Sequence, residues 1–171
     1  MHGEELVGRA RKAKEDFGAN CPKKFAGAAA IEILRAALSD KGIVTSRRDV
    51  FVRAVPVEVD LIVLHKEEKP FLDLLYEPHQ VAVALEVKKS GAFGKETLDK
   101  IRRDFARLSA TGVRCAYVTF EERQSYRWKA TSVDLGFPCF TLAWHKKTNG
   151  PLEPTQDWEG LVAFLRHAVA T

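Results

Sequence analysis

Apolar residues recur every three or four positions in several stretches of the chain, the spacing of a helix that buries one face. Residues 24–39 (KFAGAAAIEILRAALS) are apolar on nearly every side, which predicts a helix buried against a sheet. Gly18, Gly42 and Gly112 follow three of these stretches and are typical of helix ends. The pattern predicts helices at 4–17, 24–39, 95–110 and 157–169.

Between these helices lie apolar runs that alternate with polar residues or are continuous, as in strands. The run 81–88 (VAVALEVK) is apolar on both faces over most of its length, which favours a central strand. Residues 65–80 are predicted to form a long connection with room for a short element. Strands are predicted at 43–53, 55–64, 81–88, 113–120 and 138–145. The order of elements predicts a mixed α/β domain with helices packed on a central sheet.

Length and composition fit a single domain. The chain has 171 residues, of which 46% are hydrophobic and 29% charged, an ordinary globular composition. Cys21, Cys115 and Cys139 have no zinc-binding spacing, and their odd number argues against a disulfide framework. This favours a reducing, cytoplasmic setting. No stretch has the length and apolarity of a membrane span, and no signal-peptide core is expected, so no membrane partner is predicted.

Positive charge is concentrated near the start of the chain. The net charge is +4, and residues 9–24 alone hold six basic residues against two acidic ones. Such a stretch is either a solvated helix face or a surface that contacts phosphates, and the sequence leaves both open. The basic balance raises the expectation of a polyanionic partner modestly.

Charged residues interrupt two of the predicted strands. Asp60 lies in the middle of an apolar strand, where aspartate is disfavoured. Glu86 and Lys88 share one face near the end of 81–88, because side chains alternate between faces. If the two strands are antiparallel neighbours, facing side chains lie about 5 Å apart. A divalent cation between Asp60 and Glu86 would relieve the repulsion of the two carboxylates.

This combination suits phosphodiester hydrolysis. A bound Mg²⁺ or Mn²⁺ lowers the pKa of a water ligand and neutralises developing charge. A lysine two residues after the glutamate reaches the same site, where it can orient that water or stabilise the transition state.

The pattern of Asp60, then 25 residues, then Glu86-Val87-Lys88 resembles the D…(D/E)-x-K signature of the PD-(D/E)XK nucleases. In that family the core runs helix, three strands, helix, strand, with the aspartate on the second strand and E-x-K on the third. The elements predicted over 24–120 follow this order.

The resemblance implies a restriction-endonuclease-like fold, with a mixed central sheet flanked by helices. It also implies Mg²⁺ or Mn²⁺ as cofactor, with Asp60 and Glu86 as metal ligands and Lys88 as the catalytic lysine. The whole chain, 1–171, is then one domain with its nuclease core at 24–120. Its flanks are a basic N-terminal helix (1–23) and a C-terminal strand and helix extension (121–171).

Some members of the family, including archaeal Holliday-junction resolvases, add a glutamate on the preceding helix. Glu32, within AAAIEILRAA, matches that position and is implied as a further catalytic residue and metal ligand. One feature departs from the family pattern. Its proline often precedes the aspartate directly, whereas Val59 holds that position here and Pro56 lies four residues before Asp60.

Each of these residues also has a purely structural interpretation. Asp60 could be a charge at a strand end, and Glu86 and Lys88 could form a solvated ion pair on one face. Glu32 could pair with Arg35 or Arg48.

A nuclease needs cations that contact phosphates near its site. The candidates are Lys89, Lys95, Lys100, Arg103 and Arg107, although a solvated face is the alternative for any one of them. Tyr126, Arg127 and Trp128 mix aromatic and basic character, which suits stacking on nucleic acid, but core packing explains Trp128 equally well.

The sequence therefore predicts a metal-dependent nuclease that acts on nucleic acid, with DNA as the favoured substrate. Its expected role is restriction, repair or junction processing. A homodimer is implied by the resemblance only. The alternatives are an inactive nucleic-acid-binding module or accessory subunit of the same fold, and a structural protein whose charges pair across a sheet. A metal-dependent phosphatase is less well supported, because no phosphate-cradling glycine loop is present.

Overall fold

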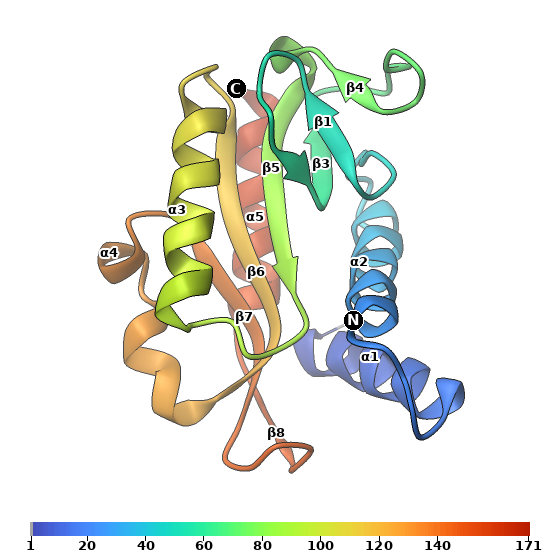
Figure 1. The fold of residues 1–171 in the computed structure, drawn as a ribbon, viewed down its shortest axis with the longest axis vertical. Helices are drawn as coiled ribbons and strands as arrows, with labels where there is room; N and C mark the ends of the chain where they lie inside the picture. Colours follow the sequence, from blue (N-terminus) through green and yellow to red (C-terminus); the bar gives the residue numbers. More distant parts are fainter. Residues whose placement is uncertain (1) are drawn as a thin grey trace.

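The computed structural model describes residues 2–171, which form two β-sheets with helices packed around them (Figure 1). The larger sheet has the strand order β3-β5-β6-β7-β8. β5, β6 and β7 run parallel to one another, whereas β3 and β8 run antiparallel to their neighbours at the two edges. Its strands are β3 (Leu61–Leu64), β5 (Val81–Lys88), β6 (Arg114–Arg123), β7 (Cys139–His145) and β8 (Leu152–Pro154).

The smaller sheet lies beside β3 and β5 and has the order β2-β1-β4. β1 is antiparallel to β2 and parallel to β4, so this sheet is also mixed. Its strands are β1 (Val50–Val52), β2 (Glu58–Val59) and β4 (Leu75–Tyr76), and the short 3₁₀ turn η1 (Pro78–Gln80) leads from β4 into β5.

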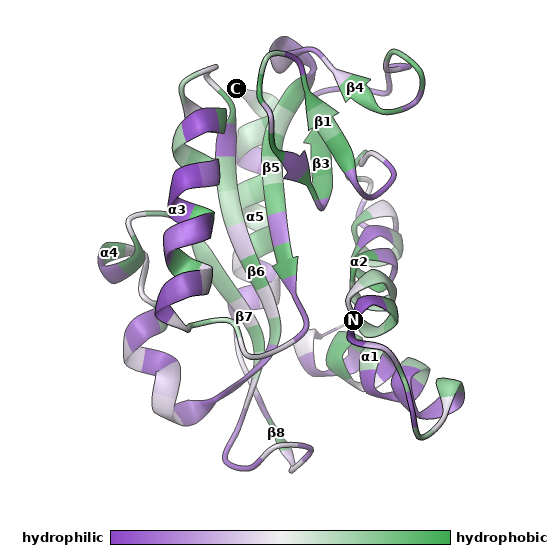
Figure 2. Cartoon of the chain, in the orientation of Figure 1, coloured by the Kyte–Doolittle hydropathy of each residue, from purple (hydrophilic) through white to green (hydrophobic). Residues whose placement is uncertain are grey.

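Helices cover both faces of the larger sheet. One apolar core joins α1, α2 and α5 to the sheet, and a second core joins α3 and the smaller sheet to its other face. In Figure 2 the strands between them are largely hydrophobic, while α3 alternates hydrophilic and hydrophobic segments. The helices are α1 (Gly3–Phe17), α2 (Lys23–Ser39), α3 (Lys95–Ser109), α4 (Ser132–Leu135) and α5 (Asp157–Ala170), with a 3₁₀ segment η2 (Gln124–Ala130). None of them, within residues 2–171, is long and apolar enough to cross a membrane.

The mixed α/β architecture predicted from the sequence is confirmed. All four predicted helices are present, and β5 has the predicted bounds of 81–88. The strand predicted at 55–64 is wrong as a single element. The chain bends at Asp60, so that Glu58–Val59 joins the smaller sheet and Leu61–Leu64 joins the larger one. The carboxylate explains the break, because its Oδ2 accepts the N–H of Val87 at 2.7 Å and ties the bend to β5.

Two other differences also have local causes. Of the strand predicted at 43–53, only Val50–Val52 forms a named strand, because Asp49 has a φ of +58°, outside the strand region. β8 was not predicted, since Pro154 indicates a loop. It is an edge strand, and edge strands tolerate proline.

Candidate active site

Asp60 and the end of β5 lie side by side because β3 and β5 pair antiparallel. Leu61 stands opposite Leu85 in the register, which places the preceding Asp60 next to Glu86 and Val87. The Val87 N–H donates to Oδ2 of Asp60 at 2.7 Å. The antiparallel pairing considered at the sequence level is therefore present, and it brings the two candidate carboxylates to one place.

Lys88 links these two carboxylates. Its Nζ lies 2.5 Å from Oε1 of Glu86 and 3.8 Å from Oδ2 of Asp60. The side chains of Glu86 and Asp60 are 13% and 20% exposed, against 37% for Lys88. One ammonium group therefore stands against two partly buried carboxylates.

The pKa of Asp60 is raised to about 6 in this environment. Burial is the largest cause, and the negative charge of Glu86 adds to it, whereas Lys88 and the Val87 N–H lower the pKa. Burial and a like charge both disfavour the ionised form. The pair is thus short of positive charge, which is a mark of candidate functional sites.

A cleft of about 950 Å³ adjoins Asp60 and Lys88. The turn between α1 and α2, together with the first turns of α2, forms one wall, and the end of β5 forms another. Its cationic lining consists of Lys14, Lys23, Lys24, Arg48, Lys88 and Lys89, and its carboxylates are Asp49, Glu58 and Asp60. Three of these lysines belong to the basic stretch 9–24, so that stretch borders the candidate site.

The loop that follows β5 is held by two buried side chains of β6. Glu122 accepts the N–H of Ala92 at 2.8 Å, and the hydroxyl of Tyr117 donates to the carbonyl of Ala92 at 2.9 Å. Burial raises the pKa of Glu122 to about 7, although the N–H groups of Ala92 and Gly91 oppose that rise. Burial also raises the pKa of Tyr117, so its hydroxyl stays protonated and remains a donor. This clamp fixes the backbone that follows Lys88.

Glu121 is a further buried carboxylate at the same end of the sheet, and sequence analysis did not identify it. Nε of Arg11 donates to its Oε2 at 2.9 Å, and Nζ of Lys89 donates to its Oε1 at 2.8 Å. Burial alone would raise the pKa of Glu121. The hydrogen bonds from Arg11 and Lys89 outweigh burial, and the net result is a lowered pKa. The three side chains join α1 to the sheet beside the cleft. Their role was hidden because the strand predicted at 113–120 ends before Glu121, whereas β6 continues through Arg123.

Of the four catalytic candidates, the structure brings together Asp60, Glu86 and Lys88. Glu32 instead pairs with Arg35 on α2, with 2.8 Å between Oε2 and Nη2, and it does not line the cleft. Within residues 2–171, no group of three or more His, Cys, Asp or Glu side chains is arranged to hold a metal. In this structure Glu32 therefore forms the ion pair with Arg35 that the sequence offered as its structural alternative.

Lys100 is the α3 cation whose charge interacts with the carboxylate pair. Its pKa is raised, first by the hydrogen bond that it donates to Asp104 at 2.8 Å and then by the negative charges of Glu86 and Asp60, while burial opposes the rise. A cation from α3 therefore contributes to the field at the site.

The other four cations predicted to contact phosphates lie in different settings. Lys89 is 14% exposed and bound to Glu121, so it forms part of the cleft wall rather than an open surface. Arg107 makes a long ion pair of 3.9 Å on α3. Lys95 and Arg103 are exposed, and neither forms an ion pair within the described chain.

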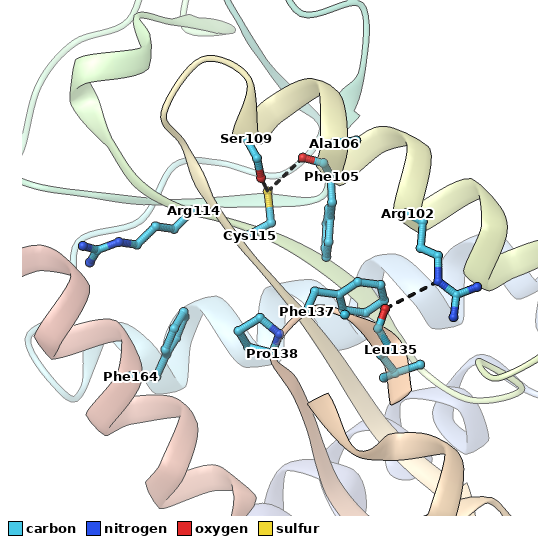
Figure 3. Close-up of a pocket in the computed structure, with 11 residues that line it drawn as sticks. Arg102, Phe105, Ala106, Ser109, Arg114, Cys115, Leu135, Phe137, Pro138 and Phe164 are labelled. Carbon is cyan, nitrogen blue, oxygen red and sulfur yellow. Dashed lines mark hydrogen bonds between the residues drawn. The ribbon is translucent and has the colours of Figure 1, made fainter. Parts of the chain in front are cut away.

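A second cavity, of about 540 Å³, lies near the start of β6 and has no carboxylate among its lining residues. Figure 3 shows Phe105 and Phe137 inside it, with Arg102 and Arg114 on opposite sides. Burial raises the pKa of the Cys115 thiol to about 11, which leaves it protonated and a poor nucleophile. This cavity therefore lacks the groups for metal-assisted or nucleophilic hydrolysis.

No protein-family model and no curated protein matches the chain by sequence. Two solved structures share its fold, NucC from P. aeruginosa ATCC27853 and NucC from E. coli MS115-1, each in a cAAA-bound form. The first is 12% identical at a TM-score of 0.63, covering 97% of this chain and 88% of that one. The second is 13% identical at the same TM-score of 0.63, covering 97% and 87%. At these identities the likeness shows the fold alone: two mixed sheets flanked by helices, in the NucC-like nuclease fold.

Proposed function

We propose that this chain is a metal-dependent nuclease that hydrolyses phosphodiester bonds, with DNA as its main substrate. The observation that carries the proposal is the partly buried pair Asp60–Glu86, bridged by Lys88, with Asp60 and Lys88 lining a cleft that is rich in cations. The NucC-like nuclease fold supports it, because the overall likeness extends over 97% of the chain.

The residues at the site fit Mg²⁺ or Mn²⁺. Mg²⁺ takes oxygen ligands and is commonly bound by one or two carboxylates, with water and substrate phosphate oxygens in the remaining positions. Asp60 and Glu86 are two such carboxylates, and one further cation would relieve the repulsion by Glu86, which adds to burial in raising the pKa of Asp60. When bound, the ion would lower the pKa of a water ligand and neutralise charge on the phosphate.

The side chains of the chain itself have separate tasks in this proposal. Lys88 carries three N–H donors, so beyond its contact with Glu86 it can hold the attacking water or a phosphate oxygen. The N–H of Val87 fixes the orientation of Asp60. The clamp on Ala92 keeps the end of β5, and with it Lys88, in place against β6.

Three further predictions from the sequence remain part of the proposal. Glu32 would complete the metal shell only after it leaves Arg35, to which it is bound in this structure. The homodimer implied by the family resemblance and the cytoplasmic location favoured by the cysteines are the other two.

Nicking of supercoiled plasmid in Mn²⁺ or Mg²⁺ tests the proposal. The wild type should nick the plasmid only when the metal is present, and Glu86→Ala should abolish nicking. Glu67→Ala, which removes an exposed glutamate that does not line the cleft, is the matched control and should retain activity. Nicking that persists in Glu86→Ala would remove this site from the reaction. A wild type that binds nucleic acid but never cleaves it would favour the inactive binding module.

A further inference from the structure

Two phenylalanines stand exposed where α1 leads into α2. Phe17 is the last residue of α1 and is 48% exposed, and Phe25 lies in the first turn of α2 and is 40% exposed. Their ring centroids are 4.7 Å apart, with the ring planes tilted by 47°. The rings therefore contact each other while each leaves a large part of its surface in water.

Helical spacing connects this pair to the cleft. Phe17 lies three residues after Lys14, and Phe25 lies three residues before Ala28. Residues three apart on a helix are neighbours on its surface. Lys14 and Ala28 both line the cleft that reaches Asp60, so the aromatic pair lies next to residues of the cleft wall, although neither ring is itself part of the lining.

Three lysines around the pair have no carboxylate partner among the described residues. Lys14, Lys23 and Lys24 form no ion pair within residues 2–171, whereas three of the cations on α3 are paired with carboxylates of their own helix. Proteins that hold single-stranded nucleic acid combine such elements, with cations that track the phosphates and aromatic rings on which bases stack.

We infer that the α1–α2 hairpin, residues 14–28, binds an unpaired stretch of nucleic acid and leads it to the carboxylate pair. The inference rests on the proposed nuclease function and names the class of its substrate. Lys14, Lys23 and Lys24 contact successive phosphates, and a base stacks on the Phe17–Phe25 pair. Because both faces of a base inside a duplex are covered by its neighbours, this platform accepts only an unpaired base. The substrate is therefore a nucleic acid with a single-stranded segment, end or branch.

Fluorescence anisotropy on the full chain in EDTA, which separates binding from cleavage, tests the inference. The probes are a labelled oligothymidylate and a blunt duplex of the same length, each titrated at several salt concentrations. The wild type should bind the single strand more tightly than the duplex. Phe17→Leu with Phe25→Leu keeps apolar bulk but removes the ring faces, and should weaken single-strand binding about fivefold or more.

The lysines should act through charge alone. Lys23→Ala with Lys24→Ala should reduce the slope of log affinity against log salt by about 1.4, because each phosphate contact of a single strand contributes roughly 0.7. The phenylalanine variant should leave that slope unchanged. Circular dichroism checks that both variants keep the helix content of the wild type.

Two matched controls lie outside the hairpin. Lys95→Ala with Arg103→Ala removes two exposed, unpaired cations from α3, and Trp128→Leu removes another exposed aromatic ring that lies beside a lysine. Neither control should change the affinity as strongly as its counterpart in the hairpin.

The outcomes distinguish a failure of the inference from a failure of the proposed function on which it rests. Equal or tighter binding of the duplex, or unchanged affinity in the phenylalanine variant, would overturn the inference even if the wild type nicks plasmid. A larger loss from the α3 or Trp128 controls would move the binding surface elsewhere and overturn it too. A wild type that neither binds nor cleaves nucleic acid would overturn the proposed function together with the inference.

Discussion

Asp60 is partly buried and Glu121 is buried at the same end of the larger sheet, yet their surroundings shift their pKa values in opposite directions. Glu121 accepts hydrogen bonds from two cations, Arg11 and Lys89, and its pKa is lowered despite burial. Asp60 faces a second carboxylate and shares one lysine with it, and its pKa is raised to about 6.

The difference distinguishes Glu121, a carboxylate that stabilises the fold, from Asp60, a carboxylate that is suited to bind a further cation. Around Glu121 two cations face one carboxylate, and removing that carboxylate would leave both partly buried cations uncompensated. Around Asp60 the balance is incomplete, so the ionised pair opposes folding until another cation arrives. Proteins carry such local conflicts mainly where function requires them.

The largest expected effect separates activity from stability at Asp60. Asp60→Asn should slow plasmid nicking about 10³-fold, the upper end of the effect of losing one electrostatic group at a reacting centre. Because burial and Glu86 raise the pKa of Asp60, neutralising it should leave the free energy of unfolding at pH 8 unchanged or higher. Nicking rates and urea unfolding measure the two effects. Retained nicking would show that the reaction does not need Asp60, and would contradict the functional half of the comparison.

Glu121→Gln should have the opposite profile. The substitution leaves Arg11 and Lys89 without their common carboxylate, and should lower the free energy of unfolding by about 3 kcal/mol. The folded fraction should still cleave, because Glu121 does not touch the carboxylate pair. Urea unfolding measures the loss, and a cost no greater than that of Asp60→Asn would contradict the structural role.

Lys88→Ala tests whether the bridging lysine acts in the reaction. Cleavage should fall about 10²-fold while affinity for nucleic acid is largely retained, because other lysines line the cleft. Single-turnover cleavage and anisotropy in EDTA separate the two quantities. Unchanged cleavage would remove Lys88 from the mechanism.

The smallest expected effect concerns Glu122, whose pKa is raised to about 7 by burial. A carboxyl group with a raised pKa in the folded state contributes stability below its unfolded pKa and loses that contribution as the pH rises through about 7. Between pH 5 and pH 8, wild-type stability should therefore fall by about 2 kcal/mol more than that of Glu122→Gln. Urea unfolding at both pH values measures the difference, and equal losses would place the titration on another group.

The meeting of Asp60, Glu86 and Lys88 could be predicted because it depends on local rules. Alternation along β5 puts Glu86 and Lys88 on one face, and antiparallel pairing with β3 brings Asp60 to them. The bend at Asp60 could not be predicted in the same way. It follows from a hydrogen bond to Val87, a residue 27 positions later in the chain.

The remaining features depend on contacts between distant elements. Glu121 looks like a surface charge until α1 brings Arg11 against it, 110 residues away in sequence. Phe17 looks like part of the buried stripe of its helix, and only the geometry of the α1–α2 hairpin leaves it exposed against Phe25. For Glu32 the family resemblance suggested a ligand, whereas an i,i+3 pair with Arg35 is what the structure contains.

Calorimetric titration of Mn²⁺ into the wild type, Asp60→Asn and Glu121→Gln tests the central claim most directly. The claim is that Asp60 and Glu86 form a metal site while Glu121 serves the fold. Mn²⁺ should bind to the wild type and to Glu121→Gln, and binding should be lost in Asp60→Asn. A wild type that binds no Mn²⁺, or binding that survives Asp60→Asn unchanged, would contradict it.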